Sequence, residues 1–347
     1  MPFKLGANPL KPLMVCRTLF YVLLLSALAR SVPAYAQAPT DFMQAGRDYT
    51  KLFTEGNAAD LWLHFSAPMK ETFTNSEVIL GMHLQFAGEY GPETALLDEK
   101  VTTVGQFAVY QRVVMFQKLT QPMAYEWSLD TKGVIVGFYL RAAVPAPSHF
   151  LDYTDKTNFR LPFKGNWIVL SGGRDILENR HASAADQRFA YDILAIRHNK
   201  TFSGSGARPG QHFCYGKAIL APADGTVVEA TDGIPDNVVN APFATPPAGN
   251  HVIIDHGNSE YSVLAHLKLG SVRVKPGDKV VSGQKIGQCG NSGNSPTPHL
   301  HFHLQNTPVL FKGEGLPVQF HHYLANKQFT ESGEPGRGQV IRNTREQ

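Results

Sequence analysis

The sequence predicts two folded domains of different class, a small α+β domain followed by an all-β antiparallel domain. Residues 40–90 have apolar residues at helical spacing, whereas residues 96–140 have short runs rich in Val, Tyr and Phe. After residue 150, short β runs alternate with Gly clusters. Of the 347 residues 43% are hydrophobic, and 31 Gly and 23 Pro indicate many turns. This composition suffices for one or two cores.

The first 36 residues have the pattern of a cleaved secretory signal. Lys11 and Arg17 precede an apolar run over residues 19–29, and an Ala-x-Ala site ends at Ala36. A run of about 11 residues is too short to cross ~30 Å of hydrocarbon, although an uncleaved anchor is the alternative. We expect cleavage after Ala36 and a periplasmic or secreted protein without a stable membrane span.

The charge balance gives no support to a nucleic-acid partner. Residues 1–36 contain four of the 32 basic residues and none of the 29 acidic ones. The remaining chain therefore has 28 basic and 29 acidic residues, a net charge of −1. Such a balance provides no basic surface for nucleic acid.

The predicted α+β domain covers residues 37–141. Apolar periodicity predicts helices within residues 42–53, 60–73 and 78–86. Strands are predicted over residues 96–104, 107–118, 123–129 and 134–140. This layout resembles the small domain DUF3887, a cystatin- or NTF2-like unit found beside wall-active enzymes. The resemblance implies that the domain positions or shields a catalytic groove.

A Pro-rich linker, residues 142–149, separates this domain from the predicted β domain over residues 150–330, which a C-terminal tail over residues 331–347 follows. Eleven of the 14 histidines lie from His181 onward. His299, His301 and His303 alternate along one predicted strand, so their side chains share a face. Imidazoles that converge on one face suit Zn²⁺.

The sequence around these histidines resembles the M23 metallopeptidases, the lysostaphin- and LytM-like cell-wall endopeptidases. The matching blocks occur in family order across about residues 181–305. They are Ala-Pro-Ala-Asp-Gly-Thr-Val-Val at 221–228, Gly-Asn-His-Val-Ile-Ile-Asp-His-Gly at 249–257, Tyr-Ser-Val-Leu-Ala-His-Leu at 261–267, Val-Lys-Pro-Gly-Asp-Lys-Val at 274–280, Gly-Gln-Lys-Ile-Gly at 283–287, Gly-Asn-Ser-Gly at 290–293 and Pro-His-Leu-His-Phe at 298–302.

The resemblance implies one zinc ion held by a His, an Asp and the second His of His-x-His. His301 and Asp192 are then metal ligands, and His266 and His299 are the two catalytic histidines. Two His and one Asp leave the fourth tetrahedral position open, as in catalytic zinc sites. His303 is expected behind the ligands, where it forms a hydrogen bond with one of them.

The remaining metal ligand is where this sequence departs from the family. The family usually has its first His four residues before the Asp, and Arg188 stands there. His181, eleven residues before Asp192, is the nearest upstream candidate. An Asn-x-His pattern at residues 179–181 resembles a subgroup with a longer loop, so we expect His181 to be the third ligand. The alternative is a degenerate site with two ligands.

Cys214 and Cys289 are the cysteines that remain once the predicted signal, with Cys16, is removed. An even number in an oxidising compartment favours a disulfide, with two buried thiols as the alternative. Neither belongs to a Cys-x-x-Cys pair.

Together these features predict a secreted zinc endopeptidase that cleaves peptide cross-links of peptidoglycan. Two alternatives stay open. One is a catalytically silent M23-like module that binds the cell wall or activates an amidase, and the other is a cysteine hydrolase that uses Cys289.

Overall fold

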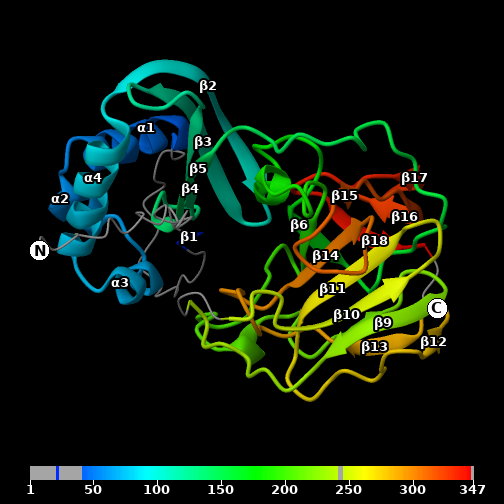
Figure 1. Cartoon of the computed structure of the whole chain (residues 1–347). Helices are drawn as coiled ribbons and strands as arrows, with labels where there is room; N and C mark the ends of the chain where they lie inside the picture. The colour runs from blue at the N-terminus through cyan, green and yellow to red at the C-terminus, as the bar shows by residue number, and fades with distance from the viewer. Residues whose placement is uncertain (1–20, 23–40, 241–244, 345–347) are drawn as a thin grey trace, which may run out of the picture.

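The structure, a computed structural model, describes residues 21–22, 41–240 and 245–344. It contains a helix-and-sheet domain and a β domain that lie side by side (Figure 1). Apart from β1 (Tyr21–Val22), the predicted signal and its cleavage site lie outside the described residues. In the described part of the chain, no helix has the length and apolar character needed to span a bilayer.

Four helices cover one face of the N-terminal sheet (Figure 1), namely α1 (Phe42–Thr54), α2 (Ala58–Leu63), α3 (Ala67–Phe73) and α4 (Ser76–Tyr90). The side chains of Asp41 and Asn75 accept backbone N–H groups at the starts of α1 and α4. The single helix predicted over residues 60–73 is wrong, because α2 ends before Pro68, which lies in the first turn of α3. Proline is tolerated there but breaks a helix interior.

The N-terminal sheet is antiparallel, with strand order β1-β5-β4-β3-β2. Its four longer strands match the predicted ones and are β2 (Glu93–Val104), β3 (Phe107–Phe116), β4 (Met123–Leu129) and β5 (Ile135–Ala142). Strand β3 is buried on both faces: Tyr110 and Val114 pack under the helices, whereas Val109 and Val113 pack against the second domain. The cystatin- or NTF2-like assignment stays a prediction.

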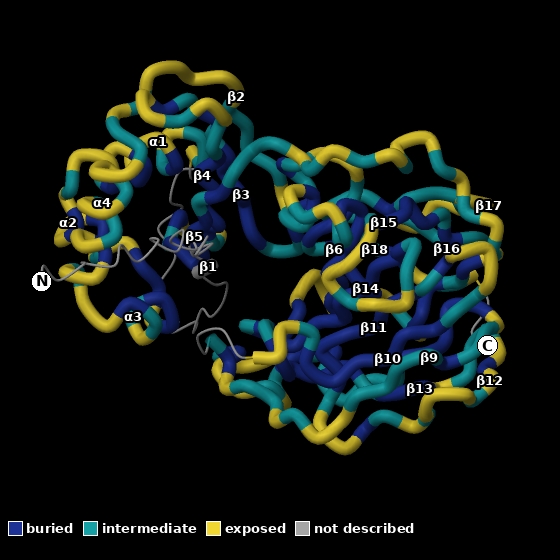
Figure 2. The backbone as a smooth tube through the Cα atoms, in the orientation of Figure 1, coloured by how far each residue is buried: buried dark blue, intermediate teal, exposed yellow. Residues whose placement is uncertain are grey.

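The second domain is built on a long antiparallel sheet, as predicted, and its central strands are dark blue in Figure 2 because they are buried. The strand order is β12-β9-β10-β11-β14-β7-β6-β18-β16-β17, with β15 beside β14 and a separate pair β13-β8. The strands are β6 (Trp167–Ser171), β7 (Tyr191–Ala195), β8 (Ala218–Leu220), β9 (Gly225–Thr231), β10 (Asn250–Asp255), β11 (Tyr261–Leu267), β12 (Lys279–Val280), β13 (Lys285–Gln288), β14 (Leu300–Gln305), β15 (Gly315–Leu316), β16 (Phe320–Ala325), β17 (Gln328–Gly333) and β18 (Val340–Asn343). Strand β14 is thus flanked by β11 and β7.

The sheet continues past residue 330, where the sequence predicts the end of the domain. Strand β17 runs to Gly333, and β18 pairs with both β16 and β6, so two parts of the predicted tail, residues 331–333 and 340–343, belong to the sheet. Between β17 and β18, Arg337 forms a buried ion pair with Glu126 of the first domain, with Nη2 2.7 Å from Oε1. This contact joins the C-terminal end of the chain to the N-terminal sheet.

Candidate metal centre

Three adjacent strands bring the predicted site residues together. Asp192 on β7 lies directly opposite His301 on β14, and His301 lies opposite Ala265 on β11. Residues opposite one another share a face of the sheet, so Asp192 and His301 meet on one side. His266 follows Ala265 along β11, and His299 immediately precedes β14.

The loop before β7 carries His181 to the same place. His181 lies in a short 3₁₀ helix, η1 (Arg180–Ser183), and its backbone N–H donates to the side chain of Asn179 over 3.0 Å. The buried Asn179 amide in turn donates to the carbonyls of Gly173 and Arg188. The Asn-x-His pattern therefore has a structural reason: the Asn side chain holds the loop in the shape that presents the imidazole.

The three expected metal ligands converge. His181 Nε2 lies 2.9 Å from Asp192 Oδ2, and His301 Nδ1 lies 3.0 Å from Asp192 Oδ1. One donor atom from each of the three residues lies within 4.8 Å of the others. Two imidazole nitrogens and a carboxylate oxygen are ligands that zinc prefers, and three protein ligands leave a position open.

A chain of hydrogen bonds along β14 sets the tautomer of His301. The Gln305 Nε2 group donates to the Thr307 and Val309 carbonyls, so its Oε1 faces His303 and must accept from His303 Nε2 over 2.9 Å. His303 Nδ1 is then an acceptor, and His301 Nε2 donates to it over 3.0 Å. Consequently His301 directs a bare Nδ1 lone pair at Asp192.

This tautomer makes the contact between His301 and Asp192 unusual. Burial lowers the pKa of His301 to about 4 and that of His303 to about 3, so both rings are neutral at pH 7. Although burial raises the pKa of Asp192, His181 and His299 lower it well below its ordinary value. The ionised carboxylate thus faces a second acceptor. A cation between the two relieves the repulsion, so these residues fit a zinc ion.

The two predicted catalytic histidines have a common arrangement. His299 Nδ1 donates to the Thr297 carbonyl over 2.8 Å, and His266 Nδ1 donates to the Ser292 carbonyl over 2.9 Å. Nε2 of each ring has no backbone partner; that of His299 lies 3.4 Å from Asp192 Oδ1, and the two ring centroids lie 4.8 Å apart. Burial, followed by the nearby His299 and His301 rings, lowers the pKa of His266 well below its ordinary value. The lowered pKa keeps the His266 ring neutral at pH 7.

His266 also has a left-handed backbone, with φ of 59°. Non-glycine residues with this conformation are strained by about 1–3 kcal/mol and cluster at functional sites. Its N–H donates to the Ala248 carbonyl and its carbonyl accepts from Gly290. Gly290 allows this approach, because an added Cβ would lie 2.3 Å from the Lys268 backbone.

The site opens into a cavity of about 390 Å³. Both domains line it: Tyr139 comes from β5 of the first domain, whereas Arg180 and all the site histidines come from the second. Pro247 and Ala248 from the loop before β10, and Phe311 from the loop after β14, complete the walls. The N-terminal domain thus contributes directly to the site.

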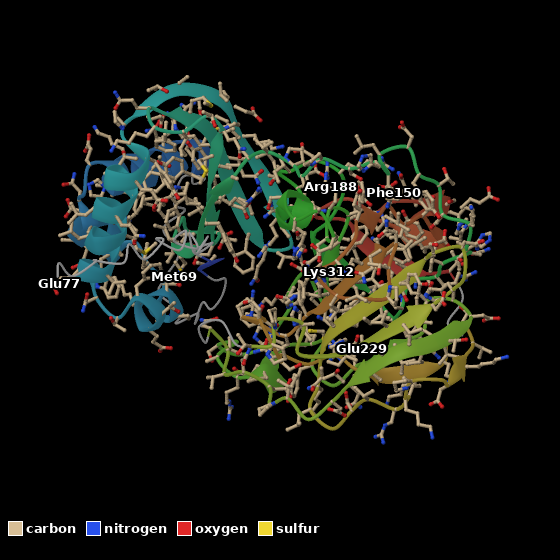
Figure 3. All side chains as sticks on the ribbon, viewed as in Figure 1. Met69, Glu77, Phe150, Arg188, Glu229 and Lys312 are labelled. Atoms are coloured by element: carbon tan, nitrogen blue, oxygen red, sulfur yellow. The ribbon has the colours of Figure 1, made fainter. Side chains whose placement is uncertain are left out.

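Arg188, labelled in Figure 3, does not replace the missing family histidine. Its Nε donates to the Ala146 carbonyl and its Nη1 to the Arg174 carbonyl, and its guanidinium lies over the Phe189 ring. The side chain therefore fixes the interdomain linker, and His181 lies beside Asp192 instead.

Cys214 and Cys289 are free, fully buried thiols in the structure rather than the predicted disulfide. Cys214 Sγ donates to the Pro298 carbonyl over 2.9 Å. Burial, and next a hydrogen bond with Cys214, raises the pKa of Cys289 well above its ordinary value. A protonated, buried thiol is a poor nucleophile, which argues against a cysteine hydrolase.

Sequence reasoning missed four residues of the site: Asn179 as a loop anchor, Gln305, Arg180 and Tyr139. Gln305 continues the every-second-residue pattern of His299, His301 and His303, so strand alternation was a usable signal. No local pattern marks Tyr139, because its place in the cavity depends on how the domains pack.

Comparison with known proteins supports the interpretation of this region. Residues 212–314 match the model of Peptidase family M23. This M23 segment includes His266, His299 and His301, whereas His181 and Asp192 precede it. The predicted resemblance is confirmed for the segment, and the resemblance of the N-terminal domain to DUF3887 stays a prediction.

The M23 segment also has curated relatives. Peptidoglycan DD-endopeptidase ShyA of Vibrio cholerae is 41% identical over 106 residues, which are 28% of this chain and 24% of ShyA. Cell division protein DipM of Caulobacter vibrioides is 28% identical over 156 residues, 43% of this chain and 24% of DipM. The matches therefore span about a quarter of either relative.

Among solved structures, the catalytic domain of the M23 protein EnpA from Enterococcus faecalis is similar, with 21% identity. The match covers 46% of this chain and 94% of that domain, with a TM-score of 0.29.

Proposed function

We propose that the chain is a zinc-dependent endopeptidase that hydrolyses peptide cross-links of peptidoglycan, after export through its N-terminal signal. The observation that carries the proposal is the donor set of His181, Asp192 and His301, which lines a cavity of about 390 Å³. The M23 match supports a peptidase, and the similarity to ShyA supports peptidoglycan as the substrate.

His181, Asp192 and His301 would hold the metal. When bound, zinc supplies Lewis-acid chemistry, which polarises the scissile carbonyl and lowers the pKa of water toward ~7. His266 and His299 exchange protons through Nε2, because a backbone carbonyl fixes Nδ1 of each ring. One accepts the proton of the attacking water and returns it to the leaving amine; the other, once protonated, donates to the developing oxyanion.

Metal analysis combined with digestion of purified peptidoglycan tests the proposal. We expect about one zinc per chain, and new amino and carboxyl termini at the cross-links by mass spectrometry. His301→Ala should lose both the zinc and the digestion, since it removes a metal ligand. His322→Ala, on β16 and outside the cavity, is a matched control that should keep both.

Two results would contradict the proposal in different ways. Digestion that persists in a zinc-free, chelator-treated protein would refute the metal mechanism. Full zinc occupancy with no new termini would refute the endopeptidase assignment and favour the silent wall-binding module.

A further inference from the structure

Arg180 is a cationic residue that lines the cavity, one residue before the proposed ligand His181. Its Nη1 donates to the Tyr139 hydroxyl over 3.1 Å, and its guanidinium carbon lies 4.8 Å from the centre of the Tyr139 ring. Its backbone N–H donates to Ser171 Oγ. The guanidinium is therefore held in one orientation by a residue of the other domain.

Part of the guanidinium is available to a ligand. Among the described residues, Arg180 Nε and Nη2 have no hydrogen-bond partner, whereas Nη1 has Tyr139. Arg180 as a whole is half-buried, and it lines the cavity, where a ligand would reach these donors. An arginine with open, pre-oriented donors matches the planar geometry of a carboxylate.

The charges around Arg180 are already paired with other groups. Burial lowers the pKa of Arg180, but Tyr139, Asp192 and Glu126 together raise it above its ordinary value. Glu126 pairs with Arg337 and Arg141, and Asp192 pairs with the histidines of the metal centre. The positive charge of Arg180 is consequently left for the cavity.

We propose that Arg180, positioned by Tyr139, binds a free carboxylate of the substrate. This inference rests on the proposed function and adds a specificity determinant to it. Because Arg180 lines the same cavity as the residues of the metal centre, the carboxylate that it binds belongs to a residue near the scissile bond. The favoured substrate has a carboxylate on the residue next to that bond, as when a cross-link is made to the amine of an amino acid whose own carboxyl is free.

Two synthetic peptides test the inference. They share one cross-link-like D-alanyl amide, and they differ in whether the residue on its nitrogen side ends in a carboxylate or a carboxamide. Binding is measured by calorimetry on the zinc-loaded full chain with His299→Ala, which slows cleavage. We expect the carboxylate peptide to bind ~10–100-fold more tightly, the range of a charge-assisted pair.

Adding Arg180→Gln to this background should reduce binding of the carboxylate peptide by the same factor and change carboxamide binding by less than about threefold. Arg180→Lys should recover part of the preference, because it keeps the charge without the bidentate geometry. Tyr139→Phe should reduce the preference for the carboxylate peptide, but by less than Arg180→Gln does. The matched control is Arg197→Gln, which removes an exposed arginine that lies over the Phe213 ring outside the cavity.

Equal losses for both peptides in Arg180→Gln, with zinc content and thermal unfolding unchanged, would overturn the inference. So would a carboxylate preference that survives the substitution, since the metal would then account for it. If Arg180→Gln lowers the zinc content, the same comparison of the two peptides is made with Arg180→Lys, and equal losses of binding for both peptides would again overturn the inference. Because binding alone is measured, a protein that binds selectively but cleaves neither peptide would refute the proposed function and support the Arg180 inference.

Discussion

The hydrogen-bond chain behind the metal centre makes a sharp prediction at Gln305. Gln305→Met keeps the length of the side chain and removes the Oε1 acceptor of His303 Nε2–H. Gln305 and His303 are both buried, so water does not replace the lost partner. Moving the His303 proton to Nδ1 avoids an orphaned donor, but it forces His301 to protonate Nδ1, the nitrogen that should bind zinc.

The expected effect is a ~10–100-fold loss of zinc affinity, the usual result of removing a partner of a metal ligand. This equals about 1.4–2.8 kcal/mol at ~1.4 kcal/mol per factor of ten. Leaving a buried donor unsatisfied costs a similar ~1–3 kcal/mol. The two costs do not add. If His303 keeps its tautomer, its Nε2–H is left unsatisfied; if it changes its tautomer, His301 loses zinc affinity.

Competition with a chromophoric chelator measures the affinity, and ¹⁵N spectra of the zinc-free protein show which imidazole nitrogens are protonated. Gln305→Glu is the matched control: it also loses the donors to the Thr307 and Val309 carbonyls but keeps an acceptor for His303. Glu should therefore retain zinc affinity while Met loses it. Equal affinities for the Met and Glu variants would refute the tautomer argument.

The remaining predictions concern one ligand, one catalytic histidine, the cysteines and a buried histidine. His181→Ala should lose zinc by metal analysis, and full occupancy would remove His181 from the donor set. His266→Ala should keep zinc and lower turnover ~10²–10⁴-fold, so unchanged digestion would exclude it from the mechanism. Cys214 and Cys289 should stay as thiols, so two thiols should titrate after unfolding without reductant, and the absence of free thiols would contradict this. Burial lowers the pKa of His212 to about 4, so the unfolded chain binds more protons and stability should fall as the pH drops from ~6.5 to ~4. In urea unfolding His212→Gln should reduce that fall, and an unchanged pH dependence would contradict the assignment.

The strands of both domains were predictable because their signals are local. Period-two alternation placed His299, His301 and His303 on one face, and the structure agrees. The same alternation extends to Gln305. Asn179 was predictable only in part. Its Asn-x-His pattern is visible in the sequence, but its role as a loop anchor depends on the carbonyls of Gly173 and Arg188.

The errors have long-range causes. Helical periodicity over residues 60–73 hid the break before Pro68. The segment after residue 330 looked like a tail because β18 is short, and its place depends on pairing with β6, which lies about 170 residues earlier in the chain. Contacts at such separations leave no local pattern, so sequence periodicity does not report them.

Contacts between residues far apart in the sequence also join the N-terminal domain to the second domain. Strand β3 packs an apolar face against the second domain, and the Glu126–Arg337 ion pair is buried between them. Breaking a buried pair by removing one partner costs ~3–5 kcal/mol, so the domains are expected to stay together. Tyr139 then keeps a fixed place beside Arg180. A domain that only shielded the groove would need neither this hydroxyl nor the ion pair; their presence indicates that the domain forms part of the cavity wall.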